Sequence, residues 1–391
     1  MADTKQGAKT AKTAGAARPA PKAETRPRAQ RWAPVVVRAR VTPRVPDMAE
    51  IEELFQCRLP LCTADAVFEL RGVPTAVVNG LRRVIIDEVT GYALQVGEGG
   101  FRSDRTTELF MLPQMVNPRI ELMPLWQPAA EAAAGTLRLE LNVENATAAP
   151  RVIYAGDLRV AAGAIAAPLF NPTFELAVLQ PGKTLVIEDI TVAAGRGHAM
   201  FHVACRAAFR HLDLAQHSDA EVRLESGRAA DQSGYVESCL VTDPRHHELR
   251  FTLPATTEAS AEADARRLLR AGCDTIRARL RLVLAAVDEA AAQKEAGPAL
   301  AGAMQFAAIQ LESGLAEGVL QAPGETHTVG ELLRRAIFDV APDVAFAAYS
   351  VSAHERRLTL TVRCASDAAG VISEGAQMAI ATMDEIYRSL E

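Results

Sequence analysis

The segment Gly72–Asp87, which reads GVPTAVVNGLRRVIID, recurs at Gly324–Asp339 as GETHTVGELLRRAIFD. Both copies contain Leu-Arg-Arg, and a glycine, a valine, an isoleucine and an aspartate around that tripeptide are in register. Each copy follows an apolar run and carries apolar residues at helical spacing, so each predicts a strand, a turn and an amphipathic helix. The repeat therefore indicates that the chain holds two versions of one structural unit.

The first unit extends on both sides of its repeated segment and is interrupted in the middle. We assign it to residues 47–127 and 245–290, because strand and helix patterns of the same kind occur in both stretches. The elements expected here are strands at 63–70, 91–97 and 248–253, a helix that ends near Glu88, and a long helix at about 258–290.

Residues 128–244, which separate the two parts of the first unit, read as a mainly β insertion domain. Short apolar runs alternate there with turn sequences such as Gln180-Pro181-Gly182-Lys183, a pattern typical of antiparallel strands. The expected strands are 137–143, 151–154, 174–179, 184–192 and 199–206.

The second unit is smaller and follows a linker. Residues 291–303 (AAQKEAGPALAGA) form the best linker candidate, and residues 304–391 then predict a compact unit. Its expected elements are strands near 304–311, 345–351 and 357–364 and helices at about 327–340 and 367–389. The fold class is thus α+β, with a sheet and two helices in each unit, and the two apolar helical layers can be buried against each other. Fusion makes this association intramolecular.

The N-terminal residues 1–46 form a basic segment of low complexity. They hold eleven Lys and Arg residues against two acidic residues, a net charge of +9, which leaves −15 on the rest of the chain. The scarcity of large apolar side chains predicts a disordered tail, although Val35–Val37 could add a strand. The acidic body is a poor primary binder of nucleic acid, because phosphate contacts need clustered cations.

The residues around the first copy resemble the assembly platform of cellular RNA polymerases. Residues 64–290 are similar to subunit 3 of the eukaryotic enzymes, to its archaeal counterpart and to the N-terminal domain of the bacterial alpha subunit. The motifs that carry this resemblance are Phe68–Leu70, Asn79–Arg83, Arg119–Leu125, Tyr154–Leu158 and Ala194–Phe201.

Residues 304–391 resemble subunit 11 of the eukaryotic polymerases and its archaeal counterpart. The motifs that carry this second resemblance are Glu325–Arg334, Pro342–Tyr349 and His354. In this family the two proteins form a heterodimer through their alpha-like dimerisation units, as the D/L pair of the archaeal enzymes does, and the heterodimer seeds assembly of the two largest subunits. Cellular versions are separate chains, and fusion in this order resembles the polymerases of nucleocytoplasmic large DNA viruses.

The resemblance implies a non-catalytic assembly platform of a DNA-directed RNA polymerase, with the activity in the large subunits. It implies as partners the two largest subunits and small subunits resembling subunits 10 and 12, contact with DNA only through the complex, and no membrane. It also implies an intracellular protein of the viral factory or host nucleus that could be packaged in the virion. The candidate contacts with a large subunit or between the units are Asn79, Leu81, Arg82, Arg83, His327, Leu333, Arg334, Arg335, Ile380, Met383 and Tyr387.

We predict no cofactor and no metal. Many relatives carry a cysteine-rich metal site near the loop before the insertion or within it, but the loop 98–110 has no cysteine here. Structural zinc needs four Cys or His ligands at short spacing, and the six cysteines of this chain form no such set. We therefore expect reduced thiols, no structural zinc and no iron–sulfur cluster.

The sequence also lacks a readable catalytic arrangement. Polymerase catalysis needs clustered aspartates that hold magnesium, and the chain has no Asp-x-Asp-x-Asp loop. We expect His198 to begin a strand and to make structural hydrogen bonds, and His246 and His247 to lie in a solvated turn. No apolar run approaches the length of a membrane span.

Two other functional classes stay open. A small-molecule enzyme or ligand-binding protein would need convergent polar groups in a pocket, and none is apparent in the sequence. A nucleic-acid-binding adaptor that acts through the basic tail would bind DNA in a strongly salt-dependent way, and removal of residues 1–46 would abolish that binding.

Overall fold

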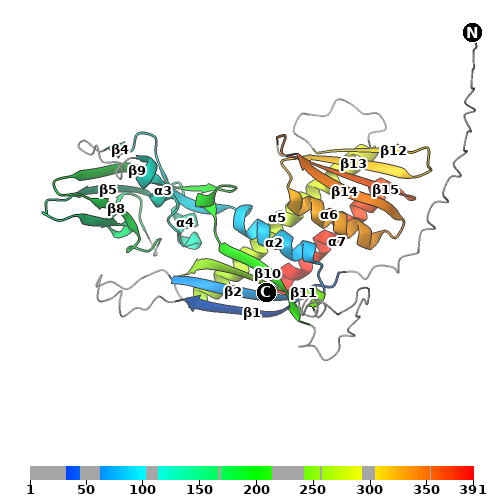
Figure 1. Ribbon diagram of the computed structural model, residues 1–391, viewed down its shortest axis with the longest axis horizontal. Coiled ribbons are helices and arrows are strands. Elements are labelled where there is room, and N and C mark those ends of the chain that lie inside the picture. Colours follow the sequence, from blue (N-terminus) through cyan, green and yellow to red (C-terminus); the bar gives the residue numbers. More distant parts are fainter. Residues whose placement is uncertain are drawn as a thin grey trace, which may run out of the picture.

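The structure is a computed structural model, and it describes residues 32–44, 62–102, 113–165, 169–213, 242–255, 258–292, 304–352 and 354–391. Over these residues the chain is a mixed α+β protein built from several antiparallel sheets. Figure 1 shows an elongated molecule with one sheet along its lower edge, a second at the upper right and a third at the far left.

The sheet along the lower edge, here called the N-terminal sheet, has the strand order β1-β2-β11-β10. Every second side chain of β2 from Ala64 to Leu70 is buried, and Phe68 stacks on Phe251 of β11. This period of two turns one face of the sheet toward two helices. The elements are β1 (Val35–Arg44), β2 (Cys62–Arg71), α2 (Thr75–Asp87), β10 (Cys205–Asp213), β11 (Thr242–Ala255) and α5 (Glu258–Ala292).

The second sheet, here called the C-terminal sheet, has the strand order β12-β13-β15-β14. Leu358, Leu360 and Val362 of β15 are buried under the helices that follow the strands. The elements are β12 (Gln305–Gln310), β13 (Ala316–Pro323), α6 (His327–Val340), β14 (Val344–Ser352), β15 (Arg357–Cys364) and α7 (Ala368–Arg388).

The two sheets have the same connectivity. In each, two strands lead into a helix, two further strands follow, and the later of these pairs with the strand that precedes the helix. The repeated glycines occupy equivalent turns, because Gly72 has a φ of +73° and Gly324 has a φ of +77°. Glycine adopts this left-handed backbone without the steric cost of a Cβ atom, which explains why this residue type occurs in both copies.

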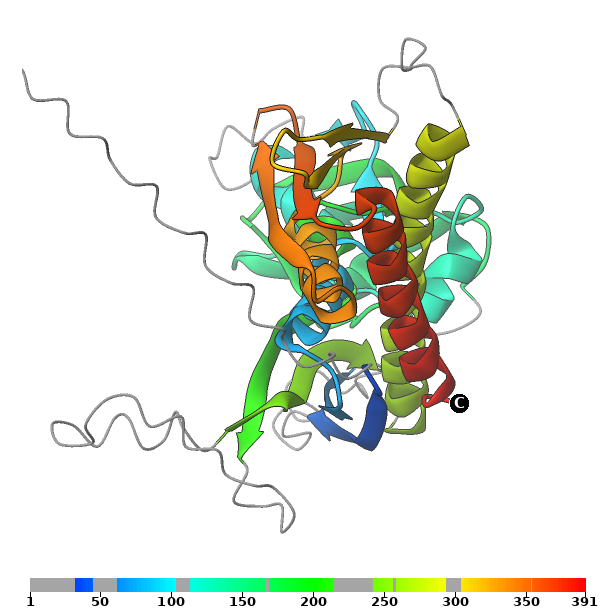
Figure 2. The same cartoon turned by 90° about the vertical axis from the view of Figure 1, so that its right-hand side faces the viewer.

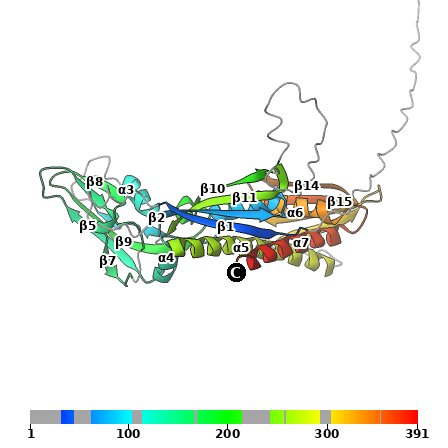
Figure 3. The same ribbon diagram turned by 90° about the horizontal axis from the view of Figure 1, so that it is seen from below.

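One hydrophobic core joins the N-terminal and C-terminal sheets. Leu81 of α2, Leu269 of α5, Leu333 of α6 and Met383 of α7 are fully buried in the same cluster. Figures 2 and 3 show α5 and α7 side by side along much of their length, while α2 and α6 lie against each other between the sheets. The two halves therefore bury their helical layers on one another.

The third sheet has a core of its own at the far end of the molecule. Its strands follow the order β3-β9-β5-β7, β4 pairs with β9, and β6 and β8 form a small separate sheet. Helices α3 and α4 pack beside it. The elements are β3 (Gly91–Val96), β4 (Phe101–Arg102), α3 (Pro113–Glu121), α4 (Gln127–Ala133), β5 (Arg138–Glu144), β6 (Arg151–Tyr154), β7 (Arg159–Ala162), β8 (Glu175–Leu179) and β9 (Thr184–Gly195).

The prediction of a disordered tail over residues 1–46 is wrong for its last part, where the strand allowed for at Val35–Val37 extends to Arg44. Trp32 is buried and β1 pairs with β2 along its length. A register shift after Val36 lets Val36, Ala39 and Val41 pack against the core, so this apolar face follows no simple alternation in the sequence. Residues 1–31 lie outside the described residues, and so does the predicted linker beyond Ala292.

Other differences concern the ends of the insertion and strands that were missed. The strand predicted at 199–206 is wrong for residues 199–204, because Ala199–Phe201 forms a short 3-10 helix that packs on Gly91 and Gly195, and β10 begins only at Cys205. The predicted boundaries do not follow the sheets, since β3 pairs with β9 whereas β10 belongs to the N-terminal sheet. The strands β4, β7 and β13 were not predicted from the sequence.

Candidate subunit interfaces

Helices α2 and α6 cross inside the shared core, and several of the predicted residues lie at this crossing. Leu81 and Leu333 are fully buried there. Arg83 of α2 donates from Nε to Oγ1 of Thr328 in α6 at 3.1 Å. A Cβ atom on Gly80 would lie 3.5 Å from the methyl carbon of Thr328, so the two helices approach closely at this point. These residues join the two halves of the chain.

A buried ionic cluster lies next to this crossing. Glu88, at the end of α2, contacts the guanidinium of Arg279 in α5 and accepts a hydrogen bond from Thr326 Oγ1 at 3.2 Å. Glu325 lies 3.8 Å from the same guanidinium. Glu88 is 8% exposed and Glu325 is 7% exposed, and burial raises the pKa of Glu325 although Arg279 acts in the opposite direction. Two carboxylates thus share one cation between the halves.

The second contact between the halves runs along α5 and α7. Met383 is fully buried, and Ile380 and Tyr387 are partly buried beside it. Arg277 of α5 contacts Asp384, and its guanidinium carbon lies 4.9 Å from the centre of the Tyr387 ring. The hydrogen bond from Arg277 to Asp384 raises the pKa of this arginine. Its charge is therefore held in place by a carboxylate and an aromatic face.

The repeated arginines have different partners in the two copies. In the first copy Arg82 donates from Nε to Asn79 Oδ1 at 3.0 Å. In the second copy Arg334 donates from Nε and Nη2 to both carboxylate oxygens of Glu331, at 2.8 and 2.6 Å. Arg335 pairs with Asp339 at 3.1 Å. The two-point contact of Arg334 with Glu331 fixes its guanidinium group and neutralises its charge.

His327 is a predicted site residue whose ring contacts the C-terminal sheet rather than the helix crossing or the α5–α7 seam. It is exposed at the first position of α6, and its ring lies edge-on to Tyr349 at 5.8 Å between centroids. The interface residues that were not predicted from the sequence include Trp32, Glu88, Arg277 and Arg279. The only signal for the two arginines was their position beside the apolar stripe of the long helix.

The histidines singled out in the sequence have structural roles. The prediction of a solvated turn at His246 and His247 is wrong, because both lie in β11 and are 1% and 0% exposed. His246 Nε2 lies 2.7 Å from Glu69 Oε1, and His247 Nε2 lies 3.1 Å from the carbonyl oxygen of Val73. His198 is exposed and accepts a hydrogen bond from the Met200 amide at 3.4 Å, but it caps the 3-10 helix and begins no strand.

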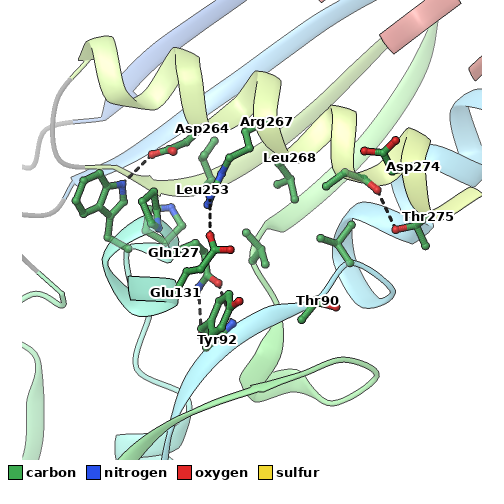
Figure 4. Close-up of a pocket in the computed structure, with 16 residues that line it drawn as sticks. Thr90, Tyr92, Gln127, Glu131, Leu253, Asp264, Arg267, Leu268, Asp274 and Thr275 are labelled. Atoms are coloured by element: carbon green, nitrogen blue, oxygen red, sulfur yellow. Dashed lines mark hydrogen bonds and ion pairs between the residues drawn. The ribbon is translucent and has the colours of Figure 1, made fainter. Parts of the chain in front are cut away.

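A cleft of about 360 Å³ lies where the third sheet meets the long helix α5 (Figure 4). Leu253 and Leu268 contribute apolar walls, and polar residues surround them. Trp126 donates from Nε1 to Asp264 Oδ2 at 2.8 Å, and Arg267 pairs with Glu131 at 3.1 Å. Burial raises the pKa of Asp264.

The polar groups of this cleft bind one another. Gln127 accepts a hydrogen bond from the amide of Tyr92 at 2.8 Å and donates one to its carbonyl oxygen at 3.2 Å. Thr275 Oγ1 donates to the carbonyl oxygen of Ala271 at 2.8 Å. The hydrogen bonds and ion pair around the cleft therefore hold α4 and β3 against α5. Convergent polar groups that await a small ligand, as an enzyme would need, are not found among the described lining residues.

Metal ligands and membrane-spanning helices bear on two further predictions. Within the ranges that the structure describes, no three His, Cys, Asp or Glu side chains are grouped as ligands of a metal ion. The sequence prediction that there is no structural zinc stays a prediction. None of the helices in the described part is both long and apolar enough to cross a membrane.

The known proteins that this chain resembles in sequence are named as subunits, or homologs of subunits, of DNA-directed RNA polymerases. The chain is 32% identical over 316 residues to the DNA-directed RNA polymerase RPB3-11 homolog of African swine fever virus, and the match covers 80% of this chain and 83% of that protein. It is 26% identical over 233 residues to the DNA-directed RNA polymerase subunit Rpo3 of Halobacterium salinarum, covering 57% of this chain and 88% of the archaeal subunit. A search with models of protein families gave no match.

Proposed function

Because the chain belongs to the family of fused RNA polymerase subunit 3–11 proteins of large DNA viruses, we propose that it is the non-catalytic assembly scaffold of its polymerase. The single observation that carries this proposal is the shared core, in which two sheet-and-helix halves of equal connectivity are joined through α2, α5, α6 and α7. Because the apolar faces of these helices are buried between the two halves, the outer surfaces are available for partner chains.

The two halves are the two alpha-like dimerisation units, and they pair within one chain. The first unit comprises residues 32–90 and 205–292, the second comprises residues 304–391, and residues 91–204 form the mainly β insertion. The equal strand order of the two sheets and the equivalent left-handed Gly72 and Gly324 support this division.

The partners of the scaffold are the two largest polymerase subunits, which hold the catalytic activity, and small subunits resembling subunits 10 and 12. DNA is contacted only through the assembled complex, since the body of this chain is acidic. The protein works inside the infected cell, in the viral factory or the host nucleus, and is packaged in the virion. Arg82 and Arg83 lie where the first unit meets a large subunit, as the resemblance to subunit 3 implies.

Co-expression with the two candidate largest subunits tests the scaffold. The tagged chain should recover both subunits in stoichiometric amounts at high salt, since obligate interfaces are large and apolar. The recovered complex should synthesise RNA, and the chain alone should not. A well-behaved chain that recovers neither subunit contradicts the proposal. Salt-dependent DNA binding by the chain alone that disappears with residues 1–31 favours the adaptor function instead.

A further inference from the structure

The arm, here defined as residues 91–195, carries the third sheet with α3 and α4 and is attached to the two halves at two places. Among the described residues, none belongs both to the core of the arm and to the core that joins the halves. Each part therefore buries its own apolar side chains. The attachments, and not a common core, decide how the arm is oriented.

The first attachment is a neck formed by two strands that pair at glycine residues. Gly91 begins β3, Gly195 ends β9, and their Cα atoms are partners in the ladder. Phe201 packs against both, because a Cβ atom on Gly91 would lie 2.0 Å from its carbonyl oxygen and a Cβ atom on Gly195 would lie 2.4 Å from its ring. The chain thus passes between the arm and the halves at two residues whose backbone changes conformation at low steric cost.

The segment that follows this glycine pair is held by the halves. The Gly197 amide donates to the carbonyl oxygen of Asp87, at the end of α2, at 2.9 Å. Nε2 of His202 lies 3.3 Å from Oδ1 of the same aspartate, and Val203 is buried in the shared core. These contacts fix the position of the neck, so a rotation of the arm has its axis at the glycine pair.

The second attachment consists of polar side chains that join the arm to α5 (Figure 4). Trp126 donates from Nε1 to Oδ2 of Asp264 at 2.8 Å, and Nη1 of Arg267 lies 3.1 Å from Oε2 of Glu131. The side chains of Arg267 and Glu131 are 50% and 56% exposed, so water weakens this ion pair. None of the four residues belongs to either core cluster of the described residues. Both contacts can therefore break without exposing a core.

The cleft of about 360 Å³ separates the arm from α5 between the two attachments. Thr90 lines it at the neck, and the pair of Trp126 and Asp264 lies at its other end. A contact with an open centre and polar ends is unlike a packed apolar interface. Relative motion of the two parts is the expectation for such a contact.

We propose that the two polar contacts with α5 form a latch, and that its release lets the arm rotate about the glycine pair of the neck as one body. In the latched state the arm lies close to α5, and release widens the cleft while the core of the arm stays intact. A hinge of this kind needs only a few residues at the ends of elements to change their φ and ψ angles. The latch is a property of the chain by itself, so its test is independent of the scaffold function.

The test breaks the latch and measures the orientation of the arm in the full-length chain. Spin labels are attached through non-canonical amino acids at Val160 of β7 and Gln377 of α7, which are both exposed, and pulsed electron paramagnetic resonance gives the distances between them. The double variant W126F/R267Q removes the indole N–H and the guanidinium, whereas D264N keeps an oxygen that accepts from the indole. We expect one narrow range of distances in the wild type and in D264N, and a broader range or a second population in W126F/R267Q.

R151Q is the matched control, because it breaks an ion pair of the same length, with Asp157, that lies within the arm. It should keep the wild-type range of distances. Backbone hydrogen exchange in β5 and β9 should stay as slow in W126F/R267Q as in the wild type, since the arm keeps its core. A wild-type range of distances in W126F/R267Q overturns the latch, and so does an equal broadening in D264N or R151Q. Faster exchange in β5 and β9 overturns it as well, because the arm would then not move as one body.

Discussion

Trp32 donates a hydrogen bond from Nε1 to Oδ2 of Asp339 at 2.9 Å, although 307 positions separate the two residues in the sequence. Trp32 precedes β1 of the N-terminal sheet, and Asp339 lies in the last turn of α6 beneath the C-terminal sheet. The equivalent aspartate of the first copy, Asp87, lies instead against His202. The start of the first half is therefore fastened to the second half by a contact that the repeat does not duplicate.

Removal of this tryptophan should destabilise the protein measurably. W32A loses a buried indole and its hydrogen bond, and we expect the free energy of unfolding to fall by about 3–5 kcal/mol. W32F retains most of the apolar contact and should lose about 1.5–3 kcal/mol, because only the hydrogen bond to a carboxylate disappears. Urea unfolding of the full chain measures both. Equal losses in the two variants would show that the hydrogen bond dominates and would contradict this ranking.

The cluster of Glu88, Arg279 and Glu325 should be sensitive to loss of its cation. R279M removes the cation that the two buried carboxylates share, and we expect a loss of about 3–5 kcal/mol in the free energy of unfolding. Adding E88Q, which removes one charge but keeps an acceptor for Thr326, should recover at least about 1 kcal/mol of that loss. Simple additivity of the two single substitutions would argue against a shared cluster.

The sequence predicted α6 well, and the reasons are local. Thr326 accepts a hydrogen bond from the Thr328 amide at 3.3 Å, which caps the helix, and apolar residues at helical spacing fix its buried face. The omitted strand β13 shows why other elements were missed. Gly318 interrupts the alternation of apolar and polar residues in β13. The structure has a glycine there because a Cβ atom would lie only 2.9 Å from Ala368 and 3.0 Å from the Phe306 ring.

The interface residues were predicted less completely than the helices that carry them. The repeat itself named Leu81, Leu333 and the arginines of both copies. The ion pair between Glu88 and Arg279 joins residues that are 191 positions apart, and no periodic pattern in the sequence indicates it. Only the packing of α5 against α2 and α6 brings such residues together, so side-chain pairing across the halves required the three-dimensional fold.

The stability of the chain should depend on pH through Glu325. Its folded pKa is raised by burial, so its contribution to stability is greatest below the ordinary pKa of a glutamate and declines as pH rises through the raised value. E325Q resembles the protonated form at every pH. We therefore expect E325Q to match the wild type in acid and to become relatively more stable as pH rises through this window. Unfolding curves measured across that range would reject the idea if the difference stayed constant.

The repeated glycines give a matched pair of substitutions with unequal costs. G324A places an alanine at a φ of +77° with open space around its Cβ, so we expect the free energy of unfolding to fall by about 1–2 kcal/mol. G72A has the same backbone strain at +73°, and its Cβ would also overlap with the carbonyl oxygen of Ala33. It should therefore cost clearly more than G324A. G314A, which has a φ of +81° and open space, is the control and should resemble G324A. Equal costs for G72A and G324A would mean that the segment before β1 yields without penalty, which would contradict a firmly docked Trp32.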